Sequence, residues 1–317
     1  MQSFVIGSAE LQAAVLTRGA TLHRVRVSVN GRSREVILSL RTPEQRRESR
    51  DYLGVSIGRY ANRIARGSFA LDGVDHQLPV NSHGNTLHGG PCGFDRRVWD
   101  VLDVGPARLE LGLTSPDGDQ GFPGTLGVRA RFEVAGSALR TTYRATTDAP
   151  TPVNLTSHVY YSLDDLKYAG AVLGQRLRIP AVAYLPVDQS GLPTGEVADV
   201  AGTPYDATSR RRLGDLPALD HTFVVPGEGL REMATLESTQ GDLRMELASN
   251  QPGLQVYTGA GMGAGGSPHP RQGTGVALEP QHFPDSVNRP EWPTTILRPG
   301  EDYLWQSEAR FTVLGVS

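Results

Sequence analysis

Four short stretches of this sequence contain side chains that could take part in binding or catalysis: residues 56–69, 85–99, 153–162 and 275–288. The first stretch, "SIGRYANRIARGSF", contains Arg59, Asn62 and Arg63. Guanidinium and carboxamide groups side by side present many fixed hydrogen-bond donors, which suits a polyhydroxylated ligand. The alternative for either arginine is an ion pair with a neighbouring carboxylate, and the stretch alone does not decide between the two.

The second and third stretches each contribute one histidine. His88 precedes two glycines, so the backbone can turn sharply and hold the imidazole at a loop tip. His158 lies in "VNLTSHVYYS", whose period of two predicts one strand with an apolar and a polar face. Each histidine has an ordinary alternative, which is a satisfied structural position for His88 and a solvated surface position for His158. The apolar face would hold Val153, Leu155, Ser157, Val159 and Tyr161, and the polar face Asn154, Thr156, His158, Tyr160 and Ser162.

The fourth stretch, "GVALEPQHFPDSVN", contains a carboxylate in an apolar strand pattern. Val276 and Leu278 should face one way, and Ala277 and Glu279 the other. We expect the strand to end at Glu279, because Pro280 cannot donate to a ladder of hydrogen bonds. A carboxylate held rigidly at a strand end suits a general base, whereas an isolated Glu is more often a surface charge.

Other chemistries have weaker support. The histidines lack the short paired spacings of metal-binding elements, and the single cysteine, Cys92, excludes a cysteine-based zinc site of the usual kind. We therefore expect no metal and no cofactor. No Gly-x-Ser-x-Gly turn of a serine hydrolase is present. The Gly-rich segment 259–275 lacks the Lys-Ser/Thr of a phosphate-binding loop, which favours a mobile surface loop over a phosphate site; whether it closes over a cleft stays open.

Composition limits the partners. The 317 residues carry a net charge of −3, which gives no electrostatic reason to expect nucleic acid or an anionic membrane surface. The N-terminus lacks a signal-peptide pattern, and no apolar run reaches the roughly 18 residues of a membrane span. We expect a cytoplasmic protein, in which the glycosylation match at Asn154 is chance. The oligomeric state is left open.

The elements that must hold these residues are strands. Hairpins are predicted at 67–78, with a turn at Asp72-Gly73, and at 128–147, with a turn at Gly136; further strands are predicted at 176–187, 241–250, 254–259 and 302–314. The one helical signal is a capping box from Thr42 to Gln45 around Pro43. The prediction is an all-β chain: a single domain over residues 1–317, built as one large antiparallel β-sandwich with few short helices.

Taken together, these stretches resemble the aldose 1-epimerases, or galactose mutarotases. The resemblance runs from about Thr17 to "LRPGEDY" near the C-terminus, and six segments follow the family's order. It implies a large β-sandwich, often called a supersandwich, with a sugar bound in an open cleft across one sheet. The six segments are "GRYANRIARGSF", "NTLHGGPCGFDRRVW", "NLTSHVYYSL", "LDHTF", "PGLQVYTG" and "LEPQHFPDSVNRPEWP".

The resemblance also implies roles for individual residues. Glu279 falls on the family's general base and His158 on its general acid, which together open and reclose the pyranose ring of a free aldose. Reference pKa values of about 4.3 and 6.5 would leave the Glu charged and the His partly protonated near neutrality. Pro280, Ser157 and Val159 depart from the residues commoner in the family, which leaves the sugar preference open. The residues implied to hold the sugar are His88, Asn62, Arg63, Asp220 and Gln255.

Three alternatives remain at this point. A non-catalytic sugar-binding or sensor domain would not need a Glu–His pair. An enzyme for phosphorylated sugars would share the fold but need a basic cluster, and Arg210, Arg211 and Arg212 form the only tight basic run, which a solvated surface patch explains equally well. A relative recruited to an unusual substrate of specialised metabolism is the third.

Overall fold

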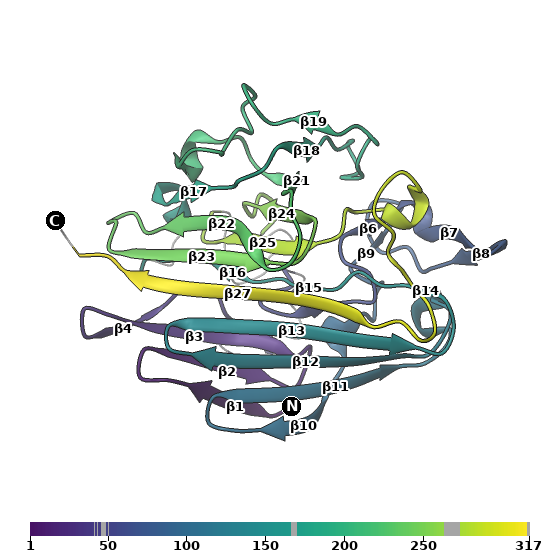
Figure 1. The fold of residues 1–317 in the computed structure, drawn as a ribbon, viewed down its shortest axis with the longest axis horizontal. Helices are drawn as coiled ribbons and strands as arrows, with labels where there is room; N and C mark the ends of the chain where they lie inside the picture. The colour runs from purple at the N-terminus through teal and green to yellow at the C-terminus, as the bar shows by residue number, and fades with distance from the viewer. Residues whose placement is uncertain are drawn as a thin grey trace.

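The computed structural model describes residues 1–40, 42, 44, 45, 49, 51–165, 170–262 and 273–315 of the chain. In these residues nearly every regular element is a strand, and the paired strands run antiparallel (Figure 1). The largest sheet, called here the large sheet, has nine strands. Its order is β10 (Asp100–Val104), β11 (Arg108–Ser115), β12 (Leu126–Ala135), β13 (Ala138–Thr147), β27 (Tyr303–Val313), β23 (Leu243–Ser249), β22 (Arg231–Glu237), β17 (Arg176–Arg178) and β20 (Arg211–Arg212).

Two further sheets lie against the large sheet. The covering sheet has six strands and the N-terminal sheet has four. The covering sheet runs in the order β16 (Tyr160–Tyr161), β25 (Val276–Gln281), β24 (Gly253–Tyr257), β21 (Asp220–Val224), β18 (Ala183–Leu185) and β19 (Ala198–Asp199). The N-terminal sheet runs β1 (Ser3–Gly7), β2 (Leu11–Leu16), β3 (Thr21–Val29) and β4 (Arg32–Glu35).

Short pairs and single turns complete the described structure. No described helix is long and apolar enough to cross a membrane. The strand pairs are β5 (Ser56–Ile57) with β15 (Thr156–Ser157), β6 (Arg63–Ile64) with β9 (Thr86–Leu87), β7 (Ser68–Leu71) with β8 (Val74–Gln77), and β14 (Thr151–Pro152) with β26 (Ile296–Leu297). The 3₁₀ turns are η1 (Ala65–Gly67), η2 (Phe94–Arg96), η3 (Asp119–Gly121), η4 (Ala171–Gly174), η5 (Leu213–Asp215) and η6 (Ser286–Asn288).

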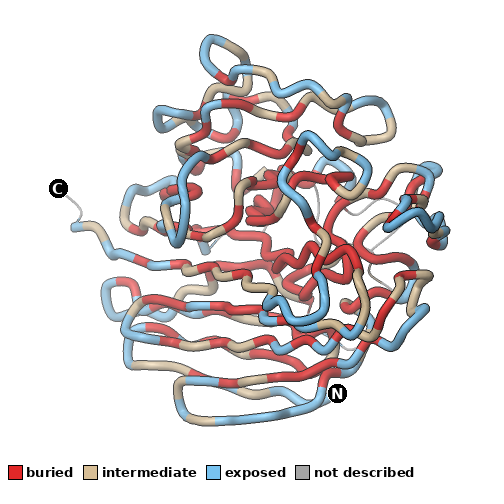
Figure 2. The backbone as a smooth tube through the Cα atoms, turned by 45° about the vertical axis from the view of Figure 1, so that its right-hand side comes forward, coloured by how far each residue is buried: buried red, intermediate tan, exposed pale blue. Residues whose placement is uncertain are grey.

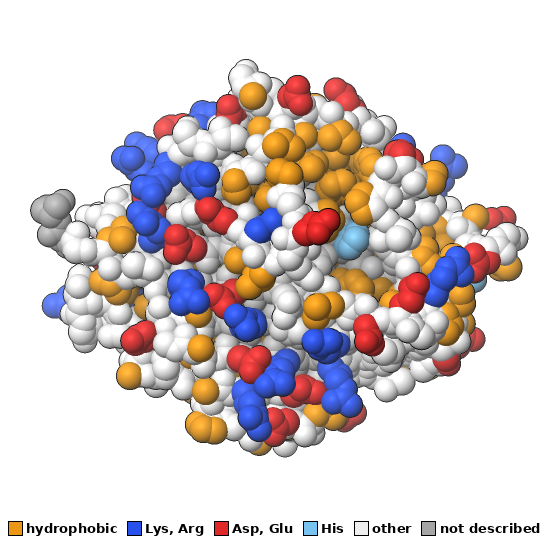
Figure 3. All heavy atoms as spheres, viewed as in Figure 1, with side chains coloured by type: hydrophobic (Ala, Val, Ile, Leu, Met, Phe, Trp, Pro, Cys, Tyr) orange, Lys and Arg blue, Asp and Glu red, His pale blue; other side chains and the backbone are white. Residues whose placement is uncertain are grey.

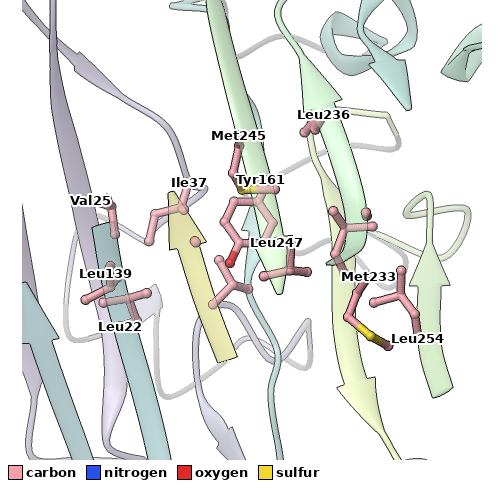
Figure 4. Close-up of a cluster of buried hydrophobic side chains, with 14 of the residues drawn as sticks. Leu22, Val25, Ile37, Leu139, Tyr161, Met233, Leu236, Met245, Leu247 and Leu254 are labelled. Carbon is pink, nitrogen blue, oxygen red and sulfur yellow. The ribbon is translucent and has the colours of Figure 1, made fainter. Parts of the chain in front are cut away.

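The main core lies between the large sheet and the two sheets that cover it. It takes side chains from all three sheets, and Figure 4 shows Leu22 of β3, Leu139 of β13, Met245 of β23 and Leu254 of β24 in the same cluster. β12 and β23 bury alternate residues, and the tube in Figure 2 changes repeatedly between buried and exposed along the large sheet. This packing of antiparallel sheets on each other confirms the predicted β-sandwich.

Both predicted hairpins are present. β7 and β8 are joined by Asp72 and Gly73, whose φ angles of 50° and 83° are typical of the two-residue turns that match the strand twist. β12 and β13 pair along their whole length around Gly136, and alternate residues of β12 from Val128 to Val134 are buried while Arg129 is exposed. The predicted capping box is also present: Thr42 and Gln45 exchange two hydrogen bonds of 3.2 Å.

The segment 153–162 does not form the one continuous strand that its period predicts. It forms β15 and β16, which pair with different partners, β5 and β25. Between them, the Val159 N–H donates to the Ser157 carbonyl at 3.0 Å, which makes a three-residue turn centred on His158. The chain therefore changes direction at the histidine.

Two other strand predictions were wrong in their limits. Residues 176–187 divide into β17 in the large sheet and β18 in the covering sheet, with Pro180 between them. β25 does not end at Glu279 but continues through Pro280 to Gln281. A proline is tolerated there because β16 pairs with β25 only as far as Ala277, so beyond that point β25 has one neighbour, β24.

Candidate active site

All seven site residues that the sequence resemblance implied line one cavity of about 190 Å³. They come from distant parts of the chain, and strands β6, β9, β21, β24 and β25 bring them together. The cavity is called the cleft below. The seven residues are Asn62, Arg63, His88, His158, Asp220, Gln255 and Glu279.

The register of the covering sheet places one wall of the cleft. Gln255 of β24 lies directly opposite Glu279 of β25, and Thr222 of β21 lies opposite Gln255. Val276 and Leu278 point into the main core, whereas Glu279 points into the cleft, as the alternation predicts. One sheet therefore has an apolar side against the core and a polar side that lines the cleft.

His158 and Glu279 form the centre of the site. His158 Nε2 lies 3.5 Å from Glu279 Oε1, and the two side chains are 5% and 2% exposed. The turn at His158 is held on both sides, because its N–H donates to Val55 and its carbonyl accepts from Gly54, each at 2.9 Å. His158 is buried, so the interpretation of it as a solvated surface histidine is wrong.

His88 is the second imidazole of the cleft, and its ring centroid lies 5.2 Å from that of His158. The Asn62 N–H donates to His88 Nδ1 at 3.2 Å, while the His88 N–H donates to the Asn62 carbonyl at 2.9 Å. Because Nδ1 accepts, a neutral His88 carries its proton on Nε2. Gly89 lets the loop approach closely: a Cβ there would lie 2.1 Å from the Gly58 carbonyl oxygen.

Three residues that line the cleft adopt left-handed backbone conformations. The φ angles are 54° for Tyr52, 59° for Asn62 and 52° for His88. Such conformations cost about 1–3 kcal/mol for residues with a side chain and persist only where the surroundings hold them. The clustering of three at one cavity indicates that the backbone is constrained to aim these side chains.

Burial shifts the protonation of the central pair away from the reference values. It lowers the pKa of His158 to about 4. Burial raises the pKa of Glu279 well above its usual value, and the charge of Asp220 adds to this while Arg63 opposes it. The pKa of His88 is lowered well below its usual value by burial, then by His158 and Arg63. The expectation of a charged Glu and a partly protonated His is therefore wrong for this structure, in which burial favours the neutral form of both groups.

Asp220 of β21 and Arg63 of β6 form a second polar group in the cleft. Gln255 Nε2 donates to Asp220 Oδ1 at 2.6 Å, and Arg63 Nη2 lies 3.7 Å from Asp220 Oδ2. Arg63 Nη1 also donates to Asn62 Oδ1 and to the Gly191 carbonyl, each at 3.3 Å. The Asp220 side chain remains 42% exposed, so its carboxylate can accept hydrogen bonds from a ligand in the cleft.

Arg59 does not belong to the cleft. Its guanidinium is buried, and each of its three nitrogens donates a hydrogen bond to an acceptor inside the protein. Nor is Arg59 paired with a carboxylate, because its acceptors are hydroxyl and carbonyl oxygens. They are Ser115 Oγ, the carbonyls of Ser115, Pro116 and Pro123, and Thr151 Oγ1, at 2.8–3.2 Å.

The motif comparison did not single out the aromatic part of the site. Tyr52 stacks against His158 with ring centroids 5.8 Å apart, and Tyr160 lies 5.0 Å from the same ring. Tyr257 shares the cleft side of β24 with Gln255, so the strand period could have identified it. Nothing in the sequence around Tyr52 marks it as a cleft residue. Asp51, Leu87 and Gly261 complete the lining.

Of the described residues of the Gly-rich segment, Gly261 lines the cleft. The Gly261 N–H donates to the Tyr257 hydroxyl at 2.6 Å, and residues 263–272, where a lid would lie, fall outside the described residues. Within the part of the chain that the structure describes, no group of three or more His, Cys, Asp and Glu side chains could hold a metal ion.

Comparison with known proteins identifies the family. A family model described as aldose 1-epimerase matches residues 2–310. The chain belongs to the aldose 1-epimerase family, whose members are isomerases. It is 37% identical to the aldose 1-epimerase of Escherichia coli, over 96% of this chain and 93% of that protein. It is 35% identical to human galactose mutarotase, over 99% of this chain and 94% of that protein.

Solved structures of similar proteins have the same fold. An aldose epimerase homologue from Caenorhabditis elegans has a TM-score of 0.92 at 25% identity, over 99% of this chain and all of that one. A galactose 1-epimerase from Lactobacillus acidophilus has a TM-score of 0.85 at 30% identity, over 97% and 93% of the two chains. The family resemblance and the fold class predicted from the sequence are both confirmed.

Proposed function

We propose that this aldose 1-epimerase interconverts the α and β anomers of a free aldohexose such as glucose or galactose, with Glu279 and His158 as its acid–base pair. The observation that carries the proposal is their contact of 3.5 Å at the centre of a cleft lined by hydrogen-bonding groups. Anomer exchange needs both groups at once, because the ring opens only when the C1 hydroxyl loses a proton and the ring oxygen gains one.

The proton balance of the reaction fits this pair. Glu279 takes the proton of the C1 hydroxyl, and His158 gives a proton to the ring oxygen as the C1–O bond breaks. Rotation about the C1–C2 bond then presents the other face of the aldehyde, and both transfers reverse on closure. Acid–base assistance of this kind contributes roughly 10²–10⁴-fold, and holding both groups against the sugar supplies the rest.

The pair needs one proton, whichever atom carries it. While the ring is closed, the working form is Glu279 ionised and His158 protonated; once the ring is open, Glu279 carries the proton and His158 is neutral. Burial, which raises the pKa of Glu279 and lowers that of His158, favours the second arrangement. Burial therefore favours the protonation state of the open-ring form, and in the proposed mechanism the proton moves to His158 when a closed sugar binds.

The remaining cleft residues supply binding. Asp220 accepts from sugar hydroxyls, while Arg63, Asn62 and the second amide hydrogen of Gln255 donate to them. The Nε2–H of His88 is a further donor beside the reacting atoms. Tyr52 and Tyr257 offer aromatic faces and edges to the C–H groups of the sugar ring.

A free sugar fits the charges of the cleft better than a phosphorylated one. Among the described lining residues, Arg63 is the one Lys or Arg, against the carboxyl groups of Asp51, Asp220 and Glu279. The basic run 210–212 does not line the cleft; Arg211 and Arg212 form β20 at the edge of the large sheet. Over much of the face seen in Figure 3, basic and acidic side chains are interspersed. Arg210 pairs with Glu237 at 3.2 Å.

Polarimetry of freshly dissolved α-D-glucose and α-D-galactose tests the proposal. We expect the protein to speed the approach to the anomeric equilibrium, with free sugars competing better than their 6-phosphates. Saturable binding without turnover would favour a sugar-binding domain, and stronger competition by the 6-phosphates would favour an enzyme of phosphorylated sugars. A cytoplasmic location is part of the proposal and fits the unpaired Cys92.

A further inference from the structure

Thr222 lies beside Gln255 on the cleft side of the covering sheet, but it is not one of the residues that line the cleft. It is 2% exposed and lies on β21, two residues after Asp220 and opposite Gln255 of β24. Its hydroxyl donates to Gln255 Oε1 at 2.5 Å, and Gln255 Nε2 in turn donates to Asp220 Oδ1 at 2.6 Å. A chain of two hydrogen bonds thus leads from a buried hydroxyl to the carboxylate at the cleft.

The directions of these two bonds are fixed by the charge of Asp220. A carboxylate accepts hydrogen bonds and does not donate them, so Gln255 must turn its NH₂ group toward Asp220. The amide oxygen then points away from the cleft, into a buried position where only a donor can satisfy it. Thr222 supplies that donor. Without that donor, the orientation that turns the NH₂ group toward Asp220 leaves the amide oxygen unsatisfied. Its advantage over the opposite orientation, with the oxygen toward Asp220, is then smaller.

Packing holds the Thr222 side chain in the rotamer that makes this bond. Its methyl group lies against Gly253 of β24, where a Cβ would come within 2.9 Å of Thr222 Cγ2. A glycine inside a strand often marks a close approach of this kind. The methyl group therefore fills the space over Gly253, and the hydroxyl is left pointing to Gln255.

From this geometry we infer that Thr222 is a positioning residue of the sugar-binding wall, which acts through Gln255 to aim the Asp220 carboxylate at the hydroxyl groups of the sugar. The inference rests on the proposed function and adds a residue to it. Within the described residues the Thr222 hydroxyl bonds to Gln255 and not to Glu279 or His158, so its effect should fall mainly on the binding of the sugar.

The test compares KM and kcat for mutarotation in variants of Thr222. Thr222→Val keeps the shape and removes the hydroxyl. It should raise KM about tenfold, because the buried amide oxygen of Gln255 loses its donor, and should leave kcat within about threefold. Thr222→Ser keeps the donor and should restore KM to within about threefold of the wild-type value. Gly253→Ala, which pushes on the Thr222 methyl group, should raise KM in the same direction.

Two controls separate positioning from general damage. Thr235→Val removes the hydroxyl of another buried strand threonine, which donates to Glu232 Oε1 at 2.7 Å in the large sheet, and should leave KM unchanged. In a Gln255→Ala background, Thr222→Val should add nothing to KM, because the residue through which it acts is gone. The dissociation constant of the sugar, measured by NMR titration, should follow KM.

Each outcome decides the inference. An unchanged KM in Thr222→Val, with normal wild-type turnover, overturns the role of Thr222 and leaves the proposed function standing. An equal rise of KM with and without Gln255, or a loss of kcat alone, overturns positioning through Gln255. If the wild type binds sugars without turnover, the proposed function fails, and the NMR dissociation constants still test Thr222. If it binds no sugar, both fail.

Discussion

The two sides of strand β25 are equally buried, but one packs in the main core and the other lines the cleft. Leu278 is 1% exposed and packs in the main core, while its neighbour Glu279 is 2% exposed and lines the cleft. Burial alone therefore does not separate the site from the core. Hydrogen bonding distinguishes the proposed acid–base pair from the structural Arg59: within the described residues Glu279 Oε2 and His158 Nδ1 are buried without a hydrogen-bond partner, whereas every guanidinium nitrogen of Arg59 donates.

Unpaired buried polar atoms reduce stability, so their presence on both members of the proposed acid–base pair needs a reason. Under the proposed function the reason is the reaction, because groups that bond to the sugar must be free of internal partners until it arrives. The core side of the same sheet has no such demand and is filled with aliphatic side chains. The comparison predicts that substitutions on the two sides divide cleanly into effects on activity and effects on stability.

The largest effect is expected on the cleft side. Glu279→Gln keeps the size and the neutral form favoured by burial but removes the base, so kcat should fall roughly 10²–10⁴-fold. The free energy of unfolding should stay within about 1 kcal/mol of the wild type, since no charge pair or packing is lost. Polarimetry and urea unfolding measure the two quantities.

Two companion variants sharpen this result. His158→Asn should lower kcat to a similar extent, while His88→Asn should weaken binding and slow the reaction less. A Glu279→Gln or His158→Asn enzyme with wild-type kcat would exclude that residue from proton transfer. An equal loss of stability and activity in Glu279→Gln would break the comparison between the two sides of β25.

The core side should respond in the opposite way. Leu278→Ala leaves a cavity between the covering sheet and the large sheet, and it should lower the free energy of unfolding by about 2–5 kcal/mol. At temperatures where the variant stays folded, kcat should remain within about threefold of the wild type. Urea unfolding followed by tryptophan fluorescence gives the first quantity. A large loss of kcat in the folded variant would show that packing behind Glu279 controls its chemistry.

The sequence predicted which residues would meet and left open how the chain would bring them there. Alternation correctly placed Leu278 and Glu279 on opposite sides, because a strand with one side in the core has a strongly specified register. It failed at His158, where a turn stabilised by one backbone hydrogen bond divides the strand. Side-chain period carries no information about which neighbouring strand accepts a backbone hydrogen bond.

The two arginines four positions apart show the same limit for the site. Arg59 and Arg63 have identical chemistry in the sequence, and only the fold brings the carbonyls of Ser115, Pro116 and Pro123 around the first. The pKa directions of Glu279 and His158 were also beyond the sequence, since they depend on how completely the surrounding sheets exclude water.

This pair of arginines gives the next prediction. Arg59→Gln leaves several buried oxygens without donors and should lower the free energy of unfolding by about 2–4 kcal/mol, with KM unchanged. Arg63→Gln removes a donor beside Asp220 and should raise KM about tenfold with little change in stability. Steady-state kinetics and urea unfolding on both variants check the division. A rise of KM in Arg59→Gln alone would reverse the two assignments.

The smallest effect is expected from acid. With the single proton of the pair on Glu279, an imidazole of ordinary pKa would gain a second proton as the pH falls through about 6.5, and kcat/KM would fall below that pH. Burial lowers the pKa of His158 to about 4, so the Glu279–His158 pair keeps its single proton down to that pH. We therefore expect kcat/KM at pH 5 to lie within about twofold of its value at pH 7, and to fall tenfold per pH unit only below pH 4, where His158 gains a second proton.

Unfolding must be separated from titration in this measurement. When the pKa of a buried histidine is lower in the folded protein than in the unfolded chain, the free energy of unfolding decreases as the pH falls from about 6.5. This applies to His158 and also to His282, whose pKa burial lowers to about 4. The matched control is His282→Gln. It removes the contribution of His282, which lies outside the cleft, to the pH dependence of the free energy of unfolding, and it should leave the acid limb of kcat/KM unchanged. An acid limb near pH 6.5 in the folded wild type would show that the cleft is wetter than its geometry indicates, and that His158 is partly protonated at neutral pH.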